Sequence, residues 1–138
     1  MRKKILFAAS IFFALSFVSG CRSDGKEEVS NATLSKVSIS HSKGFGRVNP
    51  DFFKVYEAEE DLEVFQKAFA KAVKQEGIVD MEEPEFDLEV KDKEGNKQEY
   101  HLWIGEKDET STLMKAEDTN TIYSVLAKET NELIDLIE

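Results

Sequence analysis

Few side chains in this chain can do covalent or metal chemistry. One of its 138 residues is a cysteine, Cys21, and two are histidines, His41 and His101. A Ser–His–acid arrangement could use either histidine, but no serine near them has the glycine-flanked pattern of a nucleophile elbow. A zinc site would need both histidines to converge with a carboxylate, and two ordinary strand histidines are the favoured interpretation. We therefore predict no catalytic residue, no metal site and no cofactor.

The acidic stretch from Asp80 to Glu89 is the other candidate for cation binding. It contains six carboxylate side chains: Asp80, Glu82, Glu83, Glu85, Asp87 and Glu89. The stretch lacks the glycine-centred spacing of an EF-hand calcium loop. A solvated acidic face is therefore the favoured interpretation.

The single cysteine closes a segment with the layout of a secretory signal. Basic residues at positions 2–4 precede an uncharged apolar run over 5–18, and Ser19 and Gly20 come directly before Cys21. This layout resembles the bacterial lipoprotein signal, whose cysteine receives a diacylglyceryl group and becomes the first residue after cleavage. The run is shorter than the roughly 20 residues that span a bilayer, so a cleaved signal is favoured over a transmembrane anchor. The resemblance implies a lipid anchor on Cys21 at the extracytoplasmic face of the cell membrane.

The signal divides the chain into three parts. We expect a removed signal peptide at 1–20, a flexible tether at 21–33 and one domain at 34–138. Removal of 1–20 takes away three of 18 basic residues and no acidic ones, so 15 basic residues face 28 acidic ones and the net charge is −13. Such a surface repels nucleic acid and anionic headgroups. We expect no nucleic-acid partner, and attachment to the membrane by lipid and not by charge.

Hydrophobic periodicity predicts the element order β-β-α-β-β-β-β-α. The first helix is expected over 59–76, ending before Gly77, with an apolar stripe of Leu62, Phe65, Phe69, Ala72 and Val73. Six strands are expected, over 34–40, 52–56, 86–91, 99–104, 112–116 and 121–126.

Short turns, the last of them at 118–120, join the final four strands, which predicts an antiparallel meander. A terminal helix carries Thr130, Leu133, Ile134 and Ile137 on one face. The prediction is an α+β domain in which two helices pack on one face of an antiparallel sheet that includes one or two N-terminal strands.

The strand at 99–104 separates two sets of side chains. Tyr100, Leu102 and Ile104 alternate with Glu99, His101 and Trp103. If the helices cover the first set, the second presents an aromatic ring beside polar groups, which makes it a candidate binding face. The favoured alternative is that Phe45, Phe52 or Phe53 folds over Trp103, which we expect to be partly buried.

Three further stretches resemble a known family: 77–84, which contains Gly-Ile-Val-Asp-Met and Glu-Pro; 100–105, which reads Tyr-His-Leu-Trp-Ile-Gly; and 118–123, which reads Asp-Thr-Asn-Thr-Ile-Tyr. Together they resemble the YhfM-like small lipoproteins of Bacillus and related Firmicutes, over roughly Val37 to Ile137. The resemblance implies a Gram-positive source and an outward-facing lipoprotein, and it transfers no site residue.

Composition, signal and resemblance together favour a binding or interaction module without enzymatic activity, with a protein or cell-envelope partner. The alternative is a small envelope enzyme, or an enzyme inhibitor, acting on wall-associated substrates. A cleft that joined His41 or His101 to carboxylates and a hydroxyl would favour the enzyme. A sheet face bearing Trp103 would favour binding.

Overall fold

The computed structural model describes residue 29 and residues 32–76 and 80–138. The predicted signal segment and Cys21 lie outside these residues. The described strands are β1 (Leu34–His41), β2 (Lys54–Tyr56), β3 (Val73–Gln75), β4 (Phe86–Asp92), β5 (Lys97–Trp103), β6 (Ser111–Lys115) and β7 (Asp118–Val125). The helices are α1 (Glu59–Lys71) and α2 (Ala127–Ile137). Neither is long and apolar enough to cross a membrane.

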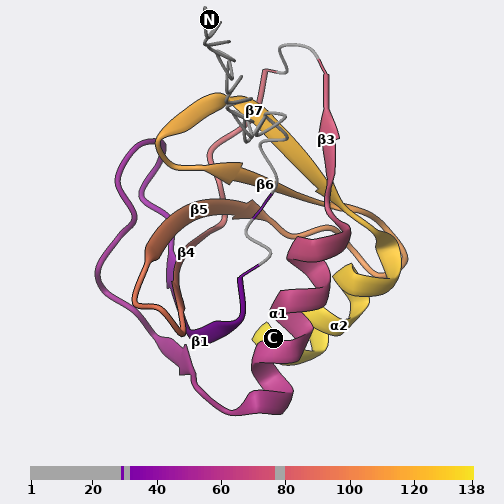
Figure 1. The fold of residues 1–138 in the computed structure, drawn as a ribbon. Helices are drawn as coiled ribbons and strands as arrows, with labels where there is room; N and C mark the ends of the chain where they lie inside the picture. Colours follow the sequence, from indigo (N-terminus) through magenta and orange to yellow (C-terminus); the bar gives the residue numbers. More distant parts are fainter. Residues whose placement is uncertain (1–28, 30–31, 77–79) are drawn as a thin grey trace, which may run out of the picture.

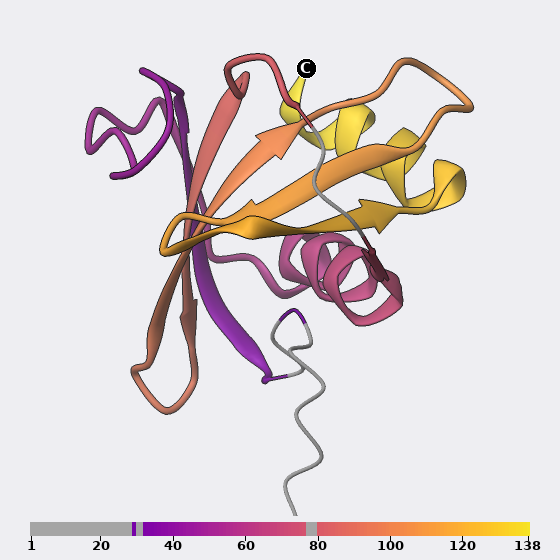
Figure 2. The same ribbon diagram turned by 90° about the horizontal axis from the view of Figure 1, so that it is seen from above.

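One antiparallel sheet organises the domain (Figure 1), in the order β2-β1-β4-β5-β6-β7-β3. The meander predicted for the last four strands is confirmed, since β4, β5, β6 and β7 pair consecutively. β1 pairs with β4, and β2 extends the sheet beyond β1. Figure 2 shows both helices on one face of this sheet, so the predicted α+β class is confirmed.

The core lies between that face and the helices. Ile39, Leu88, Tyr100 and Leu102 point into it from neighbouring strands and are each at most 1% exposed. Phe65 and Phe69 enter from α1, and the Phe69 ring lies 5.4 Å from that of Tyr100 between centroids. The helical spacing of apolar residues therefore identified the buried side of α1 correctly up to Phe69.

The first helix is shorter than predicted. It ends at Lys71 and not at Glu76, because Ala72 adopts an extended conformation with φ −60° and ψ 135°. Residues 73–75 then form β3, which pairs with β7. Backbone pairing along β7 therefore replaces the last predicted helical turn. Val73, which we assigned to the buried stripe, is 50% exposed.

Of two turns predicted in the meander, the first lies where it was expected and the last does not. The turn after β4 is as predicted: Gly95 has φ 89°, and Asp92 Oδ1 accepts the N–H groups of Glu94 and Asn96, each at 2.9 Å. Hydrogen bonds from the Asn96 side chain and these amides lower the pKa of Asp92. The last turn lies at 116–117 and not at 118–120, since Lys115 pairs with Asp118 at the start of β7.

The chain preceding β1 is attached to the domain at several points. Val29, inside the expected tether of 21–33, is 2% exposed and belongs to the core. Gln66 on α1 donates from Nε2 to the Ala32 carbonyl at 2.8 Å, and its Oε1 accepts the Leu34 N–H at 3.2 Å. Burial of a valine contributes about 1.5–3 kcal/mol, which explains why this apolar residue joins the core.

A charged pair links the two helices. Lys71 Nζ lies 2.6 Å from Oε1 of Glu129, whose side chain is 3% exposed. This hydrogen bond lowers the pKa of the Glu129 carboxyl and raises the pKa of Lys71. Both groups are therefore charged at neutral pH, as burial of the carboxylate requires.

Candidate functional site

The candidate site lies on the helix-free face, which we define as the side of the sheet opposite the helices. Cross-strand register places polar and aromatic side chains there from β1, β4 and β5, and Met114 from β6. The loop at 42–53, between β1 and β2, lies on this side of the sheet (Figure 2). The residues concerned are Ser38, Ser40, Asp87, Glu89, Glu99, His101, Trp103 and Met114.

A buried aspartate–histidine pair lies at the centre of this face. Asp87 and His101 are cross-strand neighbours, both side chains are 0% exposed, and Oδ1 lies 2.6 Å from Nδ1. Because a carboxylate only accepts hydrogen bonds, we assign the proton to Nδ1. Nε2 is buried and has no hydrogen-bond partner among the described residues.

The same aspartate fastens the covering loop to the sheet. Its Oδ2 accepts the Asn49 N–H at 2.8 Å, and Asn49 also donates from Nδ2 to the His41 carbonyl at 2.8 Å. Ser40 Oγ donates to the Asn49 carbonyl at 2.6 Å. The acidic stretch was expected to be a solvated face, and this is wrong for Asp87, whose two oxygens hold His101 and the loop.

Of the three predicted binding-face residues, two reach the surface. His101 is fully buried, whereas Trp103 and Glu99 are partly exposed. Phe45 packs across the Trp103 and His101 rings, with its centroid 6.0 Å from that of Trp103 and 6.1 Å from that of His101. Trp103 Nε1 donates to the Glu82 carbonyl at 2.9 Å. Partial cover by Phe45 therefore leaves part of the indole at the surface.

This arrangement makes a prediction for the chain's only tryptophan. Phe45→Ala removes the ring that covers Trp103, so its emission should shift to longer wavelength and neutral acrylamide should quench it more strongly. The matched control is Phe53→Ala, because Phe53 is exposed to the same degree as Phe45, 46% against 47%, but stacks on His41. Equal quenching of both variants would show that Phe45 does not cover the indole.

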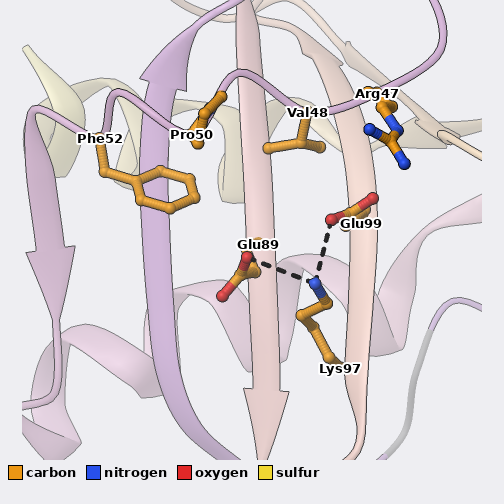
Figure 3. Close-up of a pocket in the computed structure, with 7 residues that line it drawn as sticks. All are labelled: Arg47, Val48, Pro50, Phe52, Glu89, Lys97 and Glu99. Atoms are coloured by element: carbon orange, nitrogen blue, oxygen red, sulfur yellow. Dashed lines mark ion pairs between the residues drawn. The ribbon is translucent and has the colours of Figure 1, made fainter.

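A surface pocket of about 540 Å³ lies on the same face, where Glu89 and Glu99 are two residues from Asp87 and His101 along β4 and β5. Figure 3 shows the residues that line it. Its loop side consists of Arg47, Val48, Pro50 and Phe52, and its sheet side of Glu89, Lys97 and Glu99. Glu89 and Glu99 are direct cross-strand neighbours, an unfavourable like-charge position. Lys97 Nζ offsets the repulsion, since it lies 3.7 Å from the first carboxylate and 3.4 Å from the second.

The two histidines do not share a site. His41 is exposed, and its ring stacks on Phe53 with centroids 4.6 Å apart. His101 has its carboxylate partner but no hydroxyl at Nε2 within the described chain. The residues that the structure describes also contain no group of three or more His, Cys, Asp or Glu side chains placed to hold a metal ion.

Sequence reasoning missed the Asp87–His101 pair and the loop side of the pocket. A signal for the pair was present. The predicted turn at 92–96 fixes the register of the hairpin. Residues at equal distances in sequence before and after Glu94 pair with each other, and this places Asp87 opposite His101. No comparable signal exists for Val48, Pro50 and Phe52, because a loop of this length has no periodicity.

Comparisons with known proteins agree with the fold and the resemblance. The crystal structure of a thioesterase-like protein from Clostridium sporogenes matches with a TM-score of 0.59 and 16% identity, over 80% of this chain and 97% of that chain. At this identity the match shows a shared fold alone. Comparison with curated proteins found no match. A family model described as YhfM protein matches residues 33–138. The predicted membership of the YhfM family is thereby confirmed, and this chain belongs to that family.

Proposed function

We propose that this protein is an extracytoplasmic lipoprotein, anchored through Cys21, that binds a protein or cell-envelope component at its helix-free face. The observation that carries the binding role is the pocket between the 42–53 loop and strands β4 and β5. It combines an apolar wall with charges of both signs, which suits a ligand that has apolar and polar groups.

The charges of the pocket are suited to recognition. Glu89 is mostly covered, with a side chain 18% exposed, whereas the Lys97 side chain is 49% exposed and can turn toward a ligand. Arg47 extends from the loop toward the same pocket (Figure 3). Partly covered charges interact more strongly than fully solvated ones, so a ligand that pairs with them gains specificity.

The catalytic alternative has less support. A histidine–carboxylate pair acts as a general base only when its free nitrogen can reach a substrate or a nucleophile. His101 Nε2 is enclosed, with Phe45 and Trp103 as its aromatic neighbours. An enzyme inhibitor is also a binding module. If the partner captured by this protein is an enzyme, an inhibitor is favoured; if it is another envelope component, a binding module of another kind is favoured.

The anchoring part of the proposal predicts the behaviour of Cys21→Ser. Without the thiol there is no acceptor for the diacylglyceryl group, so metabolic labelling with an alkyne fatty acid should be abolished. The protein should move from the membrane pellet to the medium or accumulate as precursor. Two acyl chains suffice for stable attachment to the membrane, so a processed protein that lacks both has lost its lipid anchor. Labelling of the variant at the wild-type level would contradict the proposal.

The binding part is tested by photo-crosslinking of the full-length protein in its native membrane. A benzoylphenylalanine at position 52 lies in the pocket, whereas one at position 53 is next to it in the chain but lies outside the pocket lining. We expect a defined covalent adduct from position 52 and none from position 53. Adducts of equal yield at both positions, or at neither, would contradict the pocket as the contact surface.

A further inference from the structure

Attachment of the chain before β1 fixes where a lipid anchor would join the domain. Val29 is held in the core, and Gln66 fastens the backbone at Ala32 and Leu34. The Lys93 N–H also donates to the Thr33 carbonyl at 2.9 Å. These contacts involve α1, β1 and the β4–β5 turn, so the attachment point is a defined end of the domain. We call it the Leu34 end.

The 42–53 loop lies at the opposite end. β1 runs from Leu34 to His41, and eight residues at strand spacing extend about 24 Å. β5 also runs away from the β4–β5 turn, over the seven residues from Lys97 to Trp103, where it ends. Figure 2 shows the start of β1 and the β4–β5 turn at one end and the loop at the other. Phe45 and Trp103, which contact each other, therefore lie far from the Leu34 end.

The length of chain between anchor and domain limits how the domain can turn. Val29 follows Cys21 by eight residues. Fully extended, these reach about 28 Å, and a flexible chain of this length has a root-mean-square reach of about 16 Å. That typical reach is shorter than β1, so the tether does not normally let the domain invert, with the loop end on the bilayer and the Leu34 end held above it.

We infer that the anchored domain stands with its Leu34 end toward the membrane and its 42–53 loop facing outward. This inference rests on the proposed lipid anchor. The pocket beside the 42–53 loop is then open to an extracytoplasmic macromolecule and does not face the lipid. Gln66 has a specific role in this orientation. Its two hydrogen bonds help to hold residues 32–34 against the domain, so that these residues do not detach and lengthen the tether.

Trp103 allows a direct test, because it is the only tryptophan in the chain. Full-length lipidated protein is reconstituted into phosphatidylcholine–phosphatidylglycerol vesicles that contain a headgroup-dansylated lipid, and energy transfer from the indole is measured. The comparison protein combines Trp103→Phe with Lys93→Trp, which places the donor at the Leu34 end. A Glu63→Trp version is a second near-end reporter, since Glu63 and Lys93 line the same pocket as Leu34. We expect transfer several-fold stronger from the near-end donors than from Trp103.

Two further variants test the cause of this difference. Insertion of about twelve Gly/Ser residues after Gly25 should raise transfer from Trp103 toward the near-end value, because the reach then exceeds the length of β1. Gln66→Ala should raise it in the same direction. Equal transfer from Trp103 in the wild-type protein and from the near-end donors in the variants, all bound to vesicles, would overturn the orientation while leaving the anchor intact. Wild-type protein that does not bind vesicles, like Cys21→Ser, would overturn the anchor and the orientation together.

Discussion

Replacement of Asp87 by alanine is expected to lower the free energy of unfolding by about 3–5 kcal/mol, the usual cost of removing one partner from a buried pair. The variant leaves His101 Nδ1 and the Asn49 N–H without their shared acceptor in a buried site. It also removes one of the hydrogen bonds that hold the 42–53 loop on the sheet. The measurement is denaturant unfolding of protein that begins at Arg22. A decrease of less than about 1 kcal/mol in the free energy of unfolding would contradict a structural role for this carboxylate.

Two controls separate the buried pair from a general effect of charge. Asp51→Ala removes a carboxylate from the same loop, but its ion pair with Lys43 is exposed and should contribute at most about 1 kcal/mol. The double variant Asp87→Leu/His101→Leu removes both polar partners. Because it leaves no orphaned polar ring, it should be more stable than Asp87→Ala.

Phe69→Ala is expected to cost about 3–5 kcal/mol, a large part of the stability of a domain this size. The ring is 2% exposed and contacts both Phe65 and Tyr100, so its removal leaves a cavity between α1 and the sheet. The measurement should use protein that begins at Arg22, since a fragment starting at 33 would lack the buried Val29.

Val73→Ala is the matched control for that variant. The sequence placed Val73 on the same helical stripe as Phe69, but the structure places it on the edge strand β3 with half of its surface exposed. Its replacement should change stability by no more than about 0.5 kcal/mol. A cost comparable with that of Phe69→Ala would mean that the predicted longer helix is correct after all.

The sequence was sufficient for those parts of the fold that depend on local pattern. Alternation located β4 to β7, and a three- and four-residue spacing located the buried side of α1. The end of α1 could not be predicted, because Ala72 and Val73 continue the helical pattern. What ends the helix there is the backbone pairing of Val73 with Ser124, a residue distant in the chain.

The candidate site was predictable only in part for the same reason. Alternation placed Trp103, His101 and Glu99 on one face, as the structure has them. Their different exposure depends on the 42–53 loop, which covers His101 completely and Trp103 partly. The conformation of that loop is set by tertiary hydrogen bonds to Asp87 and His41, which no local pattern encodes.

The pairing of β1 with β4 has a consequence for the order in which the chain folds. Phe86 follows its partner His41 by 45 residues, whereas β4 to β7 are joined by short turns. Closing a long loop is entropically slower than forming successive hairpins. We expect the meander to form first and β1, with the 42–53 loop, to dock late on the free edge of β4. Substitutions that weaken the hold of Asn49 on Asp87 should then accelerate unfolding while leaving the refolding rate almost unchanged.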